Sequence, residues 1–123
     1  MEFVFPKDFK GHAWIILDPA SEEIPFLDGL YRVMIPQDGV LRVKSFRPFE
    51  QWHESRCRYN DGTTLRAMHS HPDGSDKFGL WFGGRATQSG RRDGTDLSWI
   101  EVFVGTGKEF RERTGRPPGF QLQ

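Results

Sequence analysis

The chain has 123 residues, with 36% hydrophobic and 28% charged side chains, which favours one folded domain over residues 1–123. This composition excludes a coiled coil, a disordered tail and a large multidomain enzyme. Basic and acidic residues number 17 each, so the net charge of zero gives no bulk electrostatic reason to expect nucleic acid or an anionic membrane as a partner.

Cysteine usage and the N-terminus bear on the compartment. The single cysteine, Cys57, excludes an internal disulfide and a zinc site built from cysteines. Residues 1–6 lack the basic start and apolar run of a secretory signal, and no apolar run reaches the 18 residues of a membrane span. The sequence as written predicts a cytoplasmic protein, or a periplasmic or lipid-anchored one if a signal has been removed.

The first quarter of the chain predicts two strands and a loop. Residues 2–5 alternate in hydrophobicity and predict a strand at a sheet edge, because Pro6 ends it. Residues 12–17 predict a more buried strand. Residues 18–29 contain two prolines and four acidic side chains, and they predict a loop.

Two turn sequences predict β-hairpins. An Asp-Gly pair at residues 38–39 separates alternating runs at 30–35 and 40–44, and glycine tolerates the positive φ that such turns need. The same device recurs within residues 56–66, where Asn-Asp-Gly separates two short runs. Between the two hairpins, residues 48–53 fit either a helical turn or a strand.

A glycine-rich segment follows an aromatic one. Residues 78–82 predict a short aromatic strand. Residues 83–96 contain four glycines and predict an exposed, mobile loop that carries Arg85, Arg91 and Arg92.

The C-terminal part predicts a strand and a helix. Residues 98–104 alternate, with Ile100, Val102 and Val104 on one face and Trp99 and Phe103 on the other. Thr106 and Glu109 match a capping box, which predicts a short helix to about residue 114. The whole chain therefore predicts an all-β fold of about eight strands with one short C-terminal helix, most simply a two-layer antiparallel β-sandwich.

Three segments resemble a known family. Residues 5–15 are similar to the proline, aromatic and glycine opening of a bacterial domain of unknown function that is common in small lipoproteins. Residues 31–40 resemble its Ile-Pro-x-x-Gly hairpin, and residues 103–110 resemble its end. The resemblance implies a transthyretin-like β-sandwich and carries no catalytic residues.

A histidine pair is the strongest candidate for metal chemistry. The i, i+2 spacing predicts that His69 and His71 project to one side if the segment is extended, where Asp73 or Asp76 would supply a third ligand. Such a set is sufficient for zinc with an open position. The His-x-His-Pro sequence at residues 69–72 resembles the start of the motif of JAMM-type zinc isopeptidases. The serine and aspartate that continue that motif are absent from this chain. Two hydrogen-bonded histidines near a turn are the competing interpretation.

The favoured function is a non-enzymatic module that binds another protein, because no catalytic set is complete. Arginine and tryptophan dominate interface hot spots, which makes Arg85, Arg91, Arg92 and Trp81 the candidate partner contacts. By analogy, a small bacterial binding domain of this kind could be a toxin-neutralising immunity protein.

Two alternative functions stay open. One is a zinc-binding protein or metallohydrolase that uses His69 and His71. The other is a carbohydrate- or envelope-binding module that stacks sugars on exposed tryptophans, of which the candidates are Trp14, Trp52, Trp81 and Trp99. Cys57 predicts a small buried hydrophobe rather than a nucleophile, since its flanking arginines would lie on the opposite face of the strand. No cofactor is expected unless zinc binds.

Overall fold

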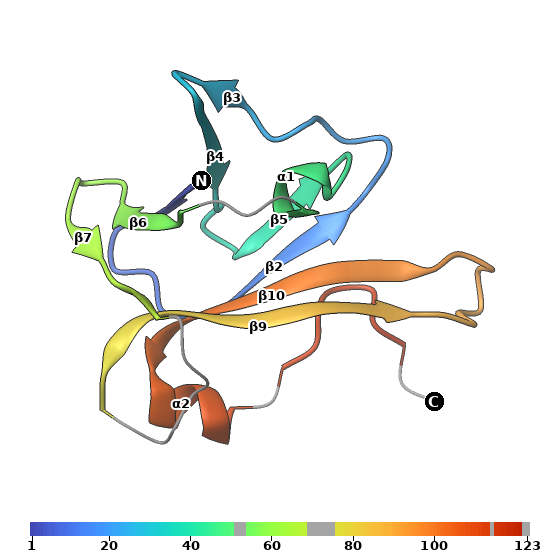
Figure 1. Ribbon diagram of the computed structural model, residues 1–123. Helices are drawn as coiled ribbons and strands as arrows, with labels where there is room; N and C mark the ends of the chain where they lie inside the picture. Colours follow the sequence, from blue (N-terminus) through green and yellow to red (C-terminus); the bar gives the residue numbers. More distant parts are fainter. Residues whose placement is uncertain (51–53, 69–75, 114, 122–123) are drawn as a thin grey trace.

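Two five-stranded β-sheets form the computed structural model, which describes residues 1–50, 54–68, 76–113 and 115–121 (Figure 1). Sheet A has the order β3-β4-β1-β6-β7, with β1 (Glu2–Phe5), β3 (Phe26–Leu27), β4 (Leu30–Met34), β6 (Arg56–Tyr59) and β7 (Thr64–Leu65). Sheet B has the order β5-β2-β10-β9-β8, with β2 (Gly11–Leu17), β5 (Val40–Val43), β8 (Ala67–Met68), β9 (Phe78–Gln88) and β10 (Leu97–Thr106). The expected all-β, sandwich-like fold is confirmed.

The two sheets share one hydrophobic core. Alternation along β1 turns Phe3 and Phe5 inward, and alternation along β10 turns Val102 and Val104 into the same cluster. All four side chains are at most 2% exposed. Each such side chain stabilises the fold by about 1.5–3 kcal/mol through burial, so this core holds the sheets together.

Strand β1 is central, not at a sheet edge as the sequence predicted. It pairs in parallel with both β4 and β6, and β2 with β5 and β8 with β9 are also parallel. The sheets are therefore mixed, and the antiparallel arrangement holds only for the other four pairings of the described strands. Between β1 and β4, and between β2 and β5, the chain visits the opposite sheet, so it returns in its original direction.

The turn at residues 36–39 joins β4 of sheet A to β5 of sheet B, so the hairpin predicted there is wrong. The turn itself forms, with Gly39 at φ +77° and its amide donating to the Pro36 carbonyl at 2.9 Å. The Gly39 carbonyl accepts from the Trp14 amide of β2 at 2.7 Å. This contact carries the chain into sheet B instead of back along β4.

The other local predictions have mixed outcomes. The hairpin of β6 and β7 is confirmed, with Cys57 opposite Leu65 and Gly62 at φ +92° in the turn. Helix α1 (Arg47–Glu50) shows that the undecided segment begins as a helical turn, while residues 51–53 lie outside the described residues. The predicted loop at 18–29 contains the short strand β3.

Helix α2 (Gly107–Glu112) and residues 115–121 lie along the outer face of sheet B (Figure 1). The helix begins at the predicted capping box: the Glu109 amide donates to Thr106 Oγ1 at 3.1 Å, and the Thr106 amide donates to Glu109 Oε1 at 3.0 Å. Two apolar clusters lie on this face: Trp14, Ile16, Leu97 and Trp99 with Phe120, and Met68, Trp81 and Phe103 with Phe110. Within the described part of the chain, no helix has the length and apolar character to cross a membrane.

Candidate functional site

The predicted loop at 83–96 is shorter in the structure, because β9 continues to residue 88. Gly83 is a bulge residue, left out of the register between β9 and β10, and a Cβ there would lie 2.9 Å from the carboxyl carbon of Glu101. The glycine therefore marks a close approach between strands and not a mobile loop. Arg85 lies on the strand, with its guanidinium 4.8 Å from the centroid of the Phe46 ring.

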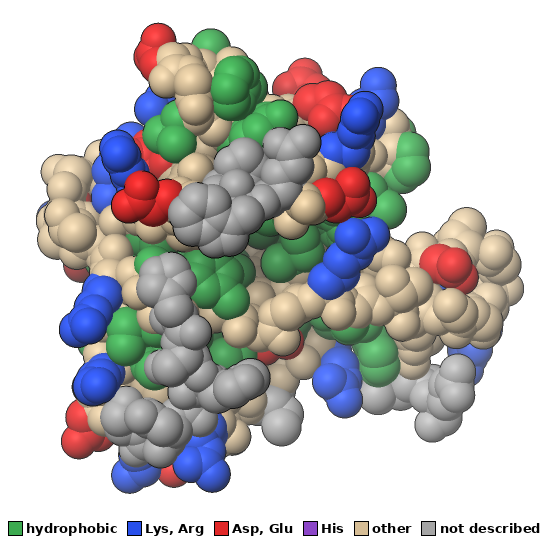
Figure 2. Space-filling model, in the orientation of Figure 1, with side chains coloured by type: hydrophobic (Ala, Val, Ile, Leu, Met, Phe, Trp, Pro, Cys, Tyr) green, Lys and Arg blue, Asp and Glu red, His purple; other side chains and the backbone are tan. Residues whose placement is uncertain are grey.

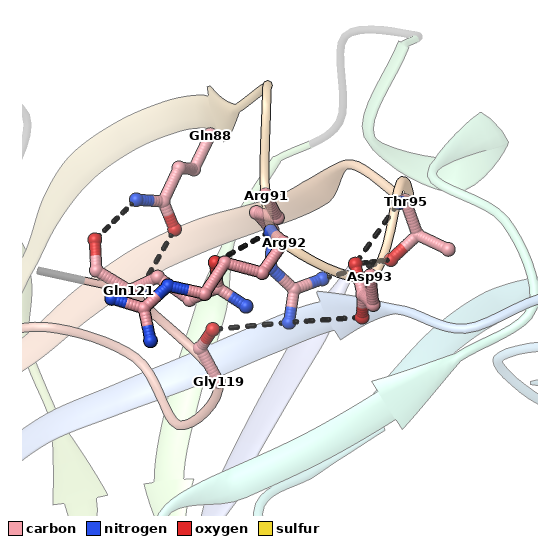
Figure 3. A network of polar contacts seen from close by, with 7 residues as sticks. All are labelled: Gln88, Arg91, Arg92, Asp93, Thr95, Gly119 and Gln121. Atoms are coloured by element: carbon pink, nitrogen blue, oxygen red, sulfur yellow. Dashed lines mark hydrogen bonds and ion pairs between the residues drawn. The ribbon is translucent and has the colours of Figure 1, made fainter. Parts of the chain in front are cut away.

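The Arg91 side chain, predicted from the sequence to contact a partner, makes hydrogen bonds within its own chain (Figure 3). Its Nη2 donates to the Gly119 carbonyl at 3.0 Å and its Nη1 to Thr95 Oγ1 at 3.1 Å, and the side chain is only 13% exposed. Arg92 is exposed and contributes its backbone amide, which donates to Gln121 Oε1 at 2.8 Å. We call Arg85, Arg91 and Arg92 the arginine surface. Gly119 and Gln121 near the end of the described chain already occupy part of it.

Gln88 completes this network, although no sequence motif marks it as functional. Its Nε2 donates to the Gln121 carbonyl at 2.6 Å, and its Oε1 accepts from the Gln121 amide at 3.0 Å. The side chain thus pairs with both backbone groups of one residue, as a neighbouring strand would. The two glutamines are 33 residues apart, so no local pattern could have connected them.

Trp81 is 1% exposed, and its Nε1 donates to the Gly105 carbonyl at 3.0 Å. This burial corrects the prediction that Trp81 contacts a partner. Trp14 and Trp99 are also buried, so these three side chains offer no exposed platform for stacking sugars. Trp52 lies outside the described residues.

The metal prediction falls mostly outside the described residues, which is where His69, His71 and Asp73 lie. Asp76 is described and exposed, and it lines an open hollow of ≈ 530 Å³. The other lining residues of that hollow are Lys108, Arg111 and Glu112. Within the described ranges, no three His, Cys, Asp or Glu side chains gather in a metal-binding arrangement.

Three further groups that could carry proton chemistry are wholly or partly enclosed: Cys57, His12 and Glu101. Burial raises the pKa of Cys57 to about 12, which leaves little thiolate at neutral pH. The side chain is buried, so the prediction that Cys57 is a small buried hydrophobe is confirmed.

His12 and Glu101 form a second, partly enclosed pair. His12 Nε2 lies 3.5 Å from Glu101 Oε1, and the His12 ring stacks on Trp14. Burial, with the charge of Arg113, lowers the pKa of His12, while burial raises the pKa of Glu101. Both shifts favour the neutral forms.

The β3–β4 hairpin is the most exposed apolar part of the described chain. Phe26 and Leu27 are each 57% exposed, and Met34 is 49% exposed. Figure 2 shows hydrophobic side chains gathered at this end of the molecule. We define the hairpin surface as Leu27, Leu30, Arg32 and Met34, which share one face of β3 and β4. Phe26 lies on the opposite face, with its ring centroid 4.7 Å from that of Tyr31.

A hollow of ≈ 230 Å³ adjoins the hairpin surface between β4 and β5. It shares Arg32 and Met34 with that surface. Its other lining residues are Glu22, Glu23, Ile24, Pro25, Leu41, Arg42 and Val43. The site therefore combines apolar side chains with charges of both signs.

Arg32 is held in place by Glu2 on the neighbouring strand. Its Nε donates to Glu2 Oε1 at 2.9 Å, and Arg58 Nε lies 3.4 Å from the other carboxylate oxygen. Burial of Glu2 opposes its ionisation, but the hydrogen bonds from Arg32 and Arg58 outweigh that effect and lower the pKa of Glu2. The carboxylate stays ionised at neutral pH and orients both guanidinium groups.

No family model and no curated protein matches this sequence. Among solved structures, the chain is similar to one described as "Putative Lipoprotein from Bacillus anthracis", with a TM-score of 0.52 and 14% sequence identity. The match covers 98% of this chain and 82% of that one. At this identity the likeness shows a shared fold, and it assigns no activity to any residue.

Proposed function

We propose that this protein is a small, non-enzymatic module that binds another protein through the hairpin surface and the adjoining hollow. The observation that carries the proposal is the exposure of Leu27 and Met34 on the same face of sheet A, beside Arg32. Single exposed apolar side chains are ordinary, whereas a group beside charged residues is typical of a protein contact site.

The hollow suits an anchoring side chain. Its volume of ≈ 230 Å³ falls below the roughly 300–1,000 Å³ of small-molecule sites. Ile24, Leu41 and Val43 give it apolar walls, while Glu22 and Arg42 supply charge. An aromatic or long aliphatic side chain of the partner would be desolvated there, and the charges would select its orientation.

Arg32 is suited to a central contact because Glu2 already orders it. Binding normally costs about 0.5–1.5 kcal/mol for each flexible side chain that becomes fixed. The 2.9 Å hydrogen bond to Glu2 removes part of that cost before the partner arrives. Arg32 is also part of the lining of the hollow, so it can contact the group that enters.

Two finer proposals accompany this function. The first is that the protein is a toxin-neutralising immunity protein, a small module that acts by binding; this assignment rests on analogy.

The second is an envelope location. The likeness to the Bacillus anthracis protein supports it, and so does the resemblance of the sequence to a family common in small lipoproteins. Fractionation of the natural host should then recover the protein with membranes, and recovery with the cytosol would contradict it.

The binding proposal is tested by site-specific photo-crosslinking in the natural host. A photoreactive residue at position 27 should give a discrete covalent adduct with the partner. The same residue at position 111, exposed on α2 and remote from sheet A, is the matched control and should give none. A third label at position 92 tests the arginine surface.

A substitution gives the second arm of this test. Met34→Asp places a charge on the hairpin surface at a side chain that is 49% exposed, so the fold should tolerate it. The adduct at position 27 should disappear in this variant. An adduct at position 92 without one at position 27 would overturn the assignment and restore the surface of Arg85 and Arg92.

A further inference from the structure

The hairpin surface continues across sheet A onto β1 and β6. Partner residues in parallel strands point to the same side of a sheet, and β1 lies between β4 and β6. Two rows of three residues therefore cross this side: Arg32, Glu2 and Arg56 in one, and Met34, Val4 and Arg58 in the other. We call these six residues the sheet A face. Phe3 and Cys57 of the same strands point into the core, so the sheet A face is turned away from it.

The sheet A face carries an excess of positive charge. Three of its side chains are arginines, and Glu2 is its one carboxylate, which leaves a net charge of +2. The whole chain has 17 basic and 17 acidic residues, so this excess is local. An acidic group from another molecule would therefore be attracted to this side of sheet A.

Glu2 holds two of the arginines in place without covering them. Arg32 Nε donates to Glu2 Oε1 at 2.9 Å, and Arg58 Nε lies 3.4 Å from Oε2. Both contacts are made through Nε, whereas the two Nη groups of a guanidinium form an edge that pairs with a carboxylate through two hydrogen bonds. In Arg58, Nη1 also donates to the Tyr59 carbonyl at a longer 3.4 Å. Both arginine side chains are 34% exposed, so a carboxylate can approach them from solvent.

A hollow of ≈ 360 Å³ adjoins the β6 side of this face. Arg56, Arg58 and Thr64 are among its lining residues, together with Glu2. An acidic side chain that enters it would meet two guanidinium groups and a hydroxyl. The acidic residues Glu22 and Glu23 line the other, smaller hollow between β4 and β5. The positive part of the surface is therefore the part on β6.

We propose that the partner bound at the hairpin surface is an acidic protein, whose Asp or Glu side chains pair with Arg32, Arg56 and Arg58. This inference rests on the proposed function, because the hairpin surface supplies the apolar half of the same contact. Leu27 and Met34 are exposed beside the arginines, and protein partners offer apolar and acidic side chains together. The zero net charge of the chain gives no bulk attraction to nucleic acid or to an anionic membrane.

Charge reversal at position 56 tests the acidic partner. Arg56 is exposed, so Arg56→Glu and the charge-conserving Arg56→Lys should both fold. With the photoreactive residue at position 27, the adduct yield in the natural host should fall at least about fivefold in Arg56→Glu and stay within about twofold of wild type in Arg56→Lys. Arg111→Glu makes the same charge change on α2, remote from sheet A, and should leave the yield unchanged. Should Arg56→Glu fail to fold by circular dichroism, Arg56→Gln replaces it and should still lower the yield.

A second label identifies what faces the arginines. Thr64 is exposed and lies opposite Arg58, so a photoreactive residue at position 64 should be joined to a peptide in which acidic residues outnumber basic ones, as read by mass spectrometry. A nucleic acid or lipid adduct there would overturn the proposal. A position 27 adduct that persists undiminished in Arg56→Glu would also overturn it, while the proposed function would stand. If the otherwise wild-type protein gave no adduct at position 27, the proposed function would fail and this inference with it.

Discussion

Replacing Trp81 with phenylalanine tests whether this side chain supports the fold or contacts a partner. The change removes the hydrogen bond from Nε1 to the Gly105 carbonyl, which is buried and would lose its side-chain donor, at a cost of about 1–3 kcal/mol. The smaller ring also leaves a void at a position that is 1% exposed, which adds roughly 1 kcal/mol or more. We expect the free energy of unfolding to fall by about 2–4 kcal/mol.

Urea denaturation followed by circular dichroism measures this loss, and a thermal scan should show a melting point about 8–16 °C lower. Phe78→Leu is the matched control, because Phe78 is 42% exposed on the same strand and should change stability by less than about 0.5 kcal/mol. If Trp81→Phe kept its stability but lost the photo-crosslinked partner, Trp81 would be a contact residue and the structural argument would be refuted.

Three further substitutions test other parts of the structure. Thr106→Ala removes the capping box and should lower the free energy of unfolding by about 1 kcal/mol, visible as a lower urea midpoint; an unchanged midpoint would argue against the cap. Gly39→Ala should cost about 1–3 kcal/mol, since φ is +77° and the new Cβ would lie 2.9 Å from the His12 carbonyl oxygen; wild-type stability would contradict this strain. The pKa of His12 is lowered by folding, so neutral His12 favours the folded state at pH values above its ordinary pKa of 6.5. This contribution to stability is lost as the pH falls below that value. Between about pH 7.5 and 5.5 the wild type should therefore lose more stability than His12→Gln, and equal losses would show that His12 does not titrate as argued.

Elements defined by neighbouring residues were predictable from the sequence. The capping box of Thr106 and Glu109 lies within one helical turn, and the hairpin around Gly62 needs only its own turn. The alternation at residues 98–104 also held, because β10 has one face in the shared core and the other beneath the C-terminal segment. In each case the contacts that define the element are local or follow directly from the two-residue period of a strand.

Features that depend on distant contacts were not predictable. The turn at Gly39 has the same local chemistry as a hairpin turn, and only its contact with Trp14 places the next strand in sheet B. Gly83 looks like a loop glycine, although its role depends on Glu101 of the next strand. Strand β1 pairs with β4 and β6, which are about 30 and 54 residues away, so its central position has no local signal.

Trp81 is buried and the Arg91 side chain is largely enclosed, so both have roles inside the fold that residue type alone does not reveal. Arginine and tryptophan are both enriched in interface hot spots. The same properties make them useful inside a fold, because the arginine guanidinium has several hydrogen-bond donors in a fixed plane and tryptophan has a large apolar ring with one donor. Here Arg91 donates to the Gly119 carbonyl and Trp81 donates to the Gly105 carbonyl of β10, whereas Leu27 is 57% exposed. Our proposal therefore rests on apolar side chains that the fold leaves in water next to an arginine that Glu2 already orders, and not on residue type.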